Sequence, residues 1–296
     1  MFRFPLLGLV LVALVAPIPS AASGAGGPRG LAFARGGDIF VARADGSRAV
    51  NVTRTKSGEY SPVWSPDGER LAFVGYRHGN AEIYVARADG RGARRLTAHP
   101  GEDISPAWSP DGRRLAFASN RSGEFELHVM NADGSRVRRV TRLAKRGYGS
   151  YSPAWSPDGR TLVFSSSGPT PENPELYSIR PDGTGLKRLT RTRGDAETLG
   201  DDGMPSFSPD GRTIVFTSNR TGDGELWTMR PDGSGQRRLA GAPRADDWAP
   251  RYSPDGRTIV YELRRGAAVD VWVVRANGTG ARLLVRNAST PAYRPG

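Results

Sequence analysis

Four acidic residues at one position of a sequence repeat are the first candidates for a functional site. They are Glu59, Asp103, Asp202 and Asp247, and each stands two residues before the first residue of an X-Pro pair. Two further units carry Ser150 and Ala288 there. A ring of carboxylates could attract a cation or a basic, extended peptide segment. The same side chains could instead begin turns and tie neighbouring units together by hydrogen bonds.

Three arginines in loops of the same units form a second candidate group. They are Arg77, Arg121 and Arg220. A guanidinium can bind a carboxylate or a phosphate through paired donors. It can also brace a loop by donating to backbone carbonyls.

The remaining residue types argue against catalysis. The chain has 296 residues, three histidines and no cysteine, so thiolate chemistry and disulfides are excluded. His128 occupies a column otherwise held by aromatic residues, and His78 and His99 lack paired carboxylates for a metal site. No nucleophile elbow, P-loop or dinucleotide-binding turn occurs. The sequence therefore predicts no enzyme, no catalytic residue, no metal site and no cofactor, with a channel cation of unknown identity left open.

The elements that position these residues repeat along the chain. Ser-Pro-Asp-Gly begins at residues 65, 109, 156, 208 and 253. The spacings of 44, 47, 52 and 45 residues indicate an array of similar supersecondary units. In each copy, proline and aspartate favour a turn, and glycine accepts a positive φ.

Residues 105–141 illustrate one unit. Short β-compatible stretches at 105–109, 114–118, 126–130 and 137–141 alternate with turns at 110–112, 120–123 and 133–134. This pattern predicts a four-stranded antiparallel meander. Large aromatic residues hold the first-strand and second-strand columns and are expected to fill the space between sheets. The second-strand column is Phe33, Phe73, Phe117, Phe164, Phe216 and Tyr261.

The two ends of the chain predict closure. The first unit, over 31–53, lacks a first strand, whereas 290–296 resembles a first strand with nothing after it. Pairing these segments would complete a sixth sheet. The sequence therefore predicts an all-β, six-bladed β-propeller of four-stranded antiparallel blades, closed by its N- and C-terminal segments.

The repeat resembles that of the TolB-like β-propeller family. The resemblance rests on Ser-Pro-x-Trp-Ser-Pro-Asp-Gly followed by Leu-Ala-Phe, Glu-Leu-Tyr, Asp-Gly-Ser and Arg-Arg-Leu-Thr, and it covers residues 29–296. It implies a periplasmic protein whose propeller binds an envelope protein near the channel mouth. Members of this family carry an α/β domain before the propeller, and we expect the propeller alone here.

The site is expected on one face of the ring. Alternate turns of a meander lie on opposite faces, so the connectors between units share a face with the loops between second and third strands. We call this the variable face, because insertions at 143–150, 166–174 and 191–203 give it irregular loops. First strands surround the axis, so the four acidic residues should ring the channel mouth there.

The leader and the charge set the expected location and partners. Arg3 precedes an apolar run over 4–18, so residues 1–25 are interpreted as a signal peptide and 26–296 as the propeller. An uncleaved anchor is the alternative, and no other segment could cross a bilayer. The net charge of +12 is spread partly over fourth-strand arginines, where charge discourages edge pairing.

We therefore expect an exported protein, periplasmic or extracellular, that acts as a monomeric scaffold for a protein or peptide partner and does not bind nucleic acid. Two alternatives stay open. One is a propeller enzyme of lyase, lactonase or glycosidase type that uses the central channel. The other is an arginine-mediated binder of a polyanion or cell-wall polymer.

Overall fold

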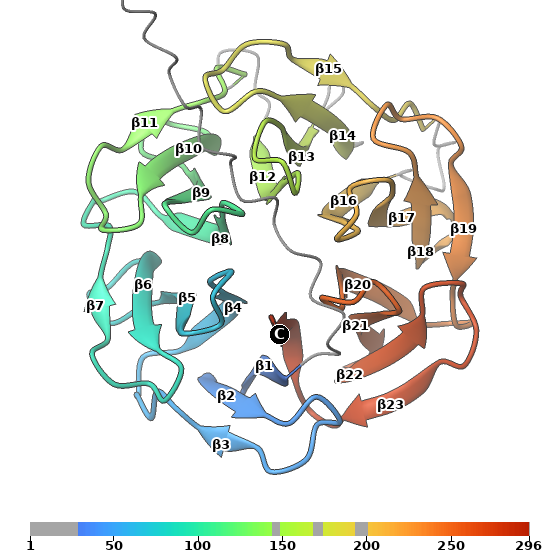
Figure 1. Cartoon of the computed structure of the whole chain (residues 1–296), viewed down its shortest axis with the longest axis horizontal. Coiled ribbons are helices and arrows are strands. Elements are labelled where there is room, and N and C mark those ends of the chain that lie inside the picture. Colours follow the sequence, from blue (N-terminus) through green and yellow to red (C-terminus); the bar gives the residue numbers. More distant parts are fainter. Residues whose placement is uncertain (1–28, 144–148, 168–173, 193–200, 296) are drawn as a thin grey trace, which may run out of the picture.

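Six four-stranded antiparallel sheets form a closed ring in the computed structural model (Figure 1). The structure describes residues 29–143, 149–167, 174–192 and 201–295. The interpretation of 1–25 as a signal peptide lies outside these residues, as do most of the three insertions. The fold prediction is confirmed, including the number of blades and of strands in each. No helix within the described ranges is long and apolar enough to span a membrane.

The strands follow one plan in every blade, from the axis outward. Blade 1 comprises β24 (Ser289–Arg294), β1 (Gly30–Arg35), β2 (Asp38–Ala42) and β3 (Val50–Asn51). Blade 2 comprises β4 (Glu59–Trp64), β5 (Arg70–Gly75), β6 (Glu82–Arg87) and β7 (Arg94–Arg95). Blade 3 comprises β8 (Asp103–Trp108), β9 (Arg114–Ser119), β10 (Glu126–Asn131) and β11 (Arg138–Arg139).

The other three blades repeat this order. Blade 4 comprises β12 (Ser150–Trp155), β13 (Leu162–Ser167), β14 (Pro174–Ile179) and β15 (Lys187–Arg188). Blade 5 comprises β16 (Asp202–Phe207), β17 (Ile214–Thr221), β18 (Asp223–Met229) and β19 (Arg237–Ala240). Blade 6 comprises β20 (Asp246–Tyr252), β21 (Thr258–Arg265), β22 (Ala268–Arg275) and β23 (Arg282–Val285).

The repeated tetrapeptide folds into a closed hydrogen-bonded turn. In blade 3, the Ser109 hydroxyl donates to the carboxylate of Asp111 and accepts the Arg114 amide at 2.9 Å. The same carboxylate accepts the Arg113 amide at 3.1 Å, and Gly112 adopts a φ of 66°. The serine, the aspartate and the glycine of the motif thus have separate geometric roles, which explains why the motif recurs on one face.

The aromatic columns form the core between blades. The five second-strand phenylalanines, Phe33 included, are at most 1% exposed, and the Tyr261 that replaces phenylalanine in blade 6 is 2% exposed. First-strand tryptophans also link blades, since Trp64 Nε1 donates to the Ala292 carbonyl at 3.2 Å and Trp155 Nε1 to the Ala107 carbonyl at 3.1 Å. The core is therefore a ring of inter-sheet layers rather than a single centre.

Blade 1 joins the two ends of the chain. Strand β24 pairs antiparallel with β1, with Leu31 opposite Tyr293 and Ala32 opposite Ala292. Figure 1 shows the C-terminus beside β1 near the centre of the ring. Closure by the terminal segments is confirmed.

Candidate functional site

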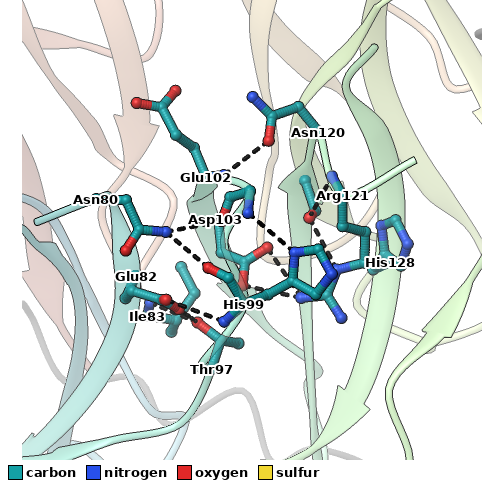
Figure 2. Close-up of polar contacts among 12 residues, drawn as sticks. Asn80, Glu82, Ile83, Thr97, His99, Glu102, Asp103, Asn120, Arg121 and His128 are labelled. Atoms are coloured by element: carbon teal, nitrogen blue, oxygen red, sulfur yellow. Dashed lines mark hydrogen bonds and ion pairs between the residues drawn. The ribbon is translucent and has the colours of Figure 1, made fainter. Parts of the chain in front are cut away.

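Three of the four predicted acidic residues pair with the three predicted loop arginines. Arg121 Nη2 lies 2.9 and 2.8 Å from the two carboxylate oxygens of Asp103, and Arg220 Nη2 contacts Asp202 at the same two distances. Arg77 donates to Glu59 Oε1 through Nε at 2.8 Å. Figure 2 shows the Asp103–Arg121 pair. The two candidate groups are therefore a single set of ion pairs.

The strand register explains this pairing. Each acid begins a first strand and lies opposite a small residue of the second strand, such as Ser119 opposite Asp103. The arginine follows two residues later, and the Ser119 hydroxyl accepts its Nε at 2.9 Å. The guanidinium also lies over the buried ring of Phe117, 5.5 Å from its centroid. In all three blades that contain such a pair, the acid and its arginine are therefore 18 residues apart in the sequence.

The four carboxylates do not form an open acidic rim. Their side chains are at most 2% exposed, whereas the three arginines retain 16 to 23% exposure. The arginines thus present cations toward solvent, and the acids beneath them neutralise part of that charge. Direct partner contact by the acids, or by Arg77, Arg121 and Arg220, stays a prediction.

Asp247 departs from this pattern. It faces Leu263 rather than glycine or serine, and Arg265, 18 residues along, continues the strand and pairs with Ala268. Its Oδ1 is buried without a hydrogen-bond partner, and no ion pair reaches it among the described residues. Burial, together with the carboxylates of Glu225 and Asp246, raises the pKa of Asp247 to about 7.

This environment predicts a pH-dependent gain from Asp247→Asn. The unfolded chain releases the Asp247 proton near the ordinary pKa of 3.8, whereas the folded chain keeps it up to about pH 7, so ionisation lowers wild-type stability as pH rises between these values. We expect the variant to match wild type near pH 4 and to exceed it by about 4 kcal/mol at pH 8. Thermal unfolding at both pH values measures this. The exposed Glu124→Gln is the control, and a gap that does not grow with pH contradicts the assignment.

A second set of acids binds the connectors between blades. In Figure 2, Glu82 of β6 accepts hydrogen bonds from the Thr97 hydroxyl and, at 3.1 Å, from the His99 amide. The Thr97 hydroxyl in turn accepts the Ile83 amide at 3.0 Å. Blades 3 and 4 repeat the acid–threonine contact. The Glu-Leu and Arg-Leu-Thr segments of the repeat therefore fix the start of each connector.

The fourth-strand cations also have structural partners. Arg95, Arg188 and Arg238 form ion pairs with the third-strand glutamates of their blades. Lys187 reaches the next blade and donates to the Asp232 carbonyl at 3.0 Å. These contacts account for much of the basic excess at this position without a polyanion.

The histidines are dispersed. His128 stacks on Phe117 with centroids 5.6 Å apart, and burial lowers its pKa to about 4, in agreement with its interpretation as a packing aromatic. His78 contacts the Tyr84 hydroxyl, and His99 Nδ1 accepts the Gly101 amide. Within the described ranges, no three histidine or acidic side chains are placed to hold a metal ion.

The sequence reasoning missed the charged residues at the axis. A cavity of about 120 Å³ lies among the first strands of all six blades, and blade 6 contributes Arg251, Glu262 and Arg264 to its lining. At the Arg251 position the other blades carry only small or medium residues, namely Val63, Ala107, Ala154, Ser206 and Ala292. The Glu262 position likewise holds Ala34, Val74, Ala118, Ser165 and Thr217 elsewhere. The contrast between these charged residues and the small or medium residues at the same repeat positions is the sequence signal that could have identified them.

The backbone at the axis is also unusual. In each blade the residue before the first-strand proline has a positive φ, and the strand register shifts there. These residues are Ser61, Ser105, Ser152, Met204, Ala249 and Thr290, with φ between 48° and 55°. Left-handed conformations are uncommon for such residues. The buried prolines that follow have no N–H, so the innermost strand exposes fewer unpaired donors to the axis.

A hollow of about 540 Å³ opens on the variable face beside the axis. It lies where the β1–β2 hairpin is shortened to a turn at Gly36 and Gly37, both with positive φ. Its lining includes Arg35, Arg264 and the stacked rings of Tyr60 and Tyr76, whose centroids are 5.9 Å apart. Arg264 lines both this hollow and the axial cavity.

The repeat plan, the six-fold closure and the turn chemistry agree with a comparison to known families. A model described as the TolB beta propeller domain matches residues 32–147 and 142–295. The chain belongs to the TolB β-propeller family. The Tol-Pal system protein TolB of Thioalkalivibrio sulfidiphilus (strain HL-EbGR7) is 46% identical over 44 residues, which are 15% of this chain and 10% of that protein.

Two further TolB proteins are similar. A TolB homolog of Chlorobium luteolum is 40% identical over 52 residues, covering 18% of this chain and 12% of that protein. The crystal structure of TolB from Acinetobacter baumannii has a TM-score of 0.76 at 21% identity, covering 90% of this chain and 66% of that one. The matched segment thus spans about a tenth of either curated relative, and the structural likeness shows the fold.

Proposed function

We propose that this TolB-family propeller is an exported, non-enzymatic and monomeric scaffold that binds a protein or peptide in the cell envelope or the extracellular space. The observation that carries the proposal is the hollow of the variable face, which combines a partly exposed tyrosine pair with two arginines next to the axis. Tyrosine and arginine are enriched where proteins bind partners. The opposite face instead repeats one compact turn five times.

In this proposal the predicted acidic residues act mainly as supports. Asp103 and Asp202 fix the guanidinium groups of Arg121 and Arg220 at the rim, and Glu59 does the same for Arg77. Pre-organised arginines lose little entropy on binding a partner. An extended segment crossing the hollow would meet Arg35, Arg264 and the Tyr76 ring, which is 39% exposed.

Partner capture tests the proposal. Immobilised wild type is exposed to the native secreted and envelope fractions, and captured proteins are quantified by mass spectrometry. We expect Tyr76→Ser to reduce capture of a specific partner at least tenfold, because it removes an exposed aromatic contact without opening the core. Leu186→Ser, at a 46% exposed site beside the Asp182-Gly183 turn, is the matched control. Equal capture by both variants would overturn the assignment of the variable face.

A further inference from the structure

We infer that the axial cavity is a carboxylate-binding site organised by Arg251 of blade 6. Arg251 occupies a position where the other blades carry alanine, serine or valine, so its long cationic side chain enters space that small side chains leave open elsewhere in the ring. Arg251 is a cation, whereas the residues that the sequence predicted at the channel mouth are acidic. The cavity belongs to the face proposed for partner binding, but carboxylate binding to the cavity can be measured without the partner.

The hydrogen bonding of Arg251 leaves donors available. Its Nη1 donates to the Pro250 carbonyl at 3.0 Å, and this is its one hydrogen bond within the described residues. A guanidinium carries five N–H donors, and those inside a cavity need acceptors. The lining is apolar at Pro62, Pro106 and Val63. It also includes four hydroxyl-bearing residues that form no hydrogen bond with Arg251, namely Ser61, Ser105, Ser152 and Thr290. An acceptor from outside the protein would satisfy these donors.

The charges at the axis favour an anion. Glu262 is 1% exposed, but its Oε2 accepts from Arg264 Nε at 3.1 Å and Nη2 at 2.9 Å, and its Oε1 accepts the Thr290 amide at 2.7 Å. Both carboxylate oxygens of Glu262 are thus hydrogen-bonded to groups other than Arg251. Two arginines and one carboxylate leave a net charge of +1 in a partly enclosed space, where attraction to an anion is stronger than in water.

The size and access indicate a carboxylate group. A planar carboxylate matches the fork of a guanidinium through two parallel hydrogen bonds. The cavity of about 120 Å³ holds a group of a few non-hydrogen atoms rather than a polymer. Arg264, whose side chain is 45% exposed, lines both this cavity and the hollow of the variable face, which gives a route from solvent. The carboxylate could belong to a small organic acid or to an acidic side chain of an entering peptide.

Calorimetric titration of the whole protein at constant ionic strength tests this inference. The probes are sodium malonate and a pair of end-blocked peptides, Gly-Gly-Asp-Gly-Gly and its asparagine counterpart. We expect half-saturation at about millimolar concentration for the carboxylate that fits. Malonate binding without peptide binding identifies a free acid as the ligand, and preference for the aspartate peptide identifies a side chain.

Three variants decide the role of the residues. Arg251→Ala, which restores the residue found in three other blades, should weaken binding at least tenfold while thermal unfolding stays cooperative. Glu262→Gln removes the competing negative charge and should tighten binding several-fold. Arg257→Ala removes the same charge from an exposed turn on the opposite face and should change nothing. Binding that is undiminished in Arg251→Ala, or no binding of any probe above a matched sodium chloride control, overturns the inference.

Discussion

Removal of residues 289–296 is expected to abolish the folded state. Strand β24 supplies the innermost strand of blade 1, so its loss leaves the backbone of β1 unpaired along one edge. It also removes the buried side chains of Ala292 and Tyr293 from two inter-blade core clusters. An open ring would expose apolar surface on both sides of the gap, and stabilities of only 5–15 kcal/mol are typical of whole domains.

Links to blade 2 increase the expected effect. The Ala292 carbonyl accepts the Trp64 indole N–H, and Arg294 donates to the Gly68 carbonyl at 2.9 Å while its guanidinium lies over the Trp64 ring. The truncation therefore damages two blade interfaces together with the sheet. Such coupled losses are not additive and favour global unfolding.

Circular dichroism and size-exclusion chromatography measure this outcome. The truncated protein should show no cooperative thermal transition and should aggregate or elute as an expanded chain. Deletion of residues 295 and 296 alone is the matched control and should retain the transition. A truncated protein that still melts cooperatively at the wild-type temperature would show that the folded ring does not require the pairing of β24 with β1.

The architecture could be predicted because each repeat position has a local cause. The Ser-Pro-Asp-Gly turn closes through its own hydroxyl and carboxylate, and the second-strand aromatics fill equivalent inter-blade layers. The first strand that blade 1 lacks at the N-terminal end of the chain could then be assigned to the C-terminal segment that forms β24. Consistent local signals in five copies compensate for ambiguity in any one of them.

The candidate site was less predictable because it depends on side-chain contacts across strands. The acids and arginines were identified separately, since a column assignment gives the distance from the axis but not the partner of a charge. Left-handed backbone at Ser61 and Met204 had no signal, because neither residue type favours that conformation. Arg251 and Glu262 did have one: they are charged exceptions in columns of small or medium residues, and exceptions to a repeat are better guides to a site than the repeat itself.

The second large effect is expected from the ion pair of blade 3. Arg121→Gln should lower the free energy of unfolding by about 3 kcal/mol, because it leaves the fully buried Asp103 carboxylate without its counter-charge. Asp103→Asn should cost less, since the Arg121 side chain is 19% exposed and can turn toward water. The double variant should be more stable than Arg121→Gln alone, because it contains no uncompensated charge.

Denaturant unfolding of the two single variants and the double variant gives the coupling energy directly. Arg265→Gln is the matched control, since this arginine occupies the equivalent place in blade 6 but forms no ion pair with Asp247, and its effect should stay within about 0.5 kcal/mol. If the effects of the two single variants are additive, or if Arg265→Gln loses as much stability as Arg121→Gln, the Asp103–Arg121 ion pair does not stabilise the fold.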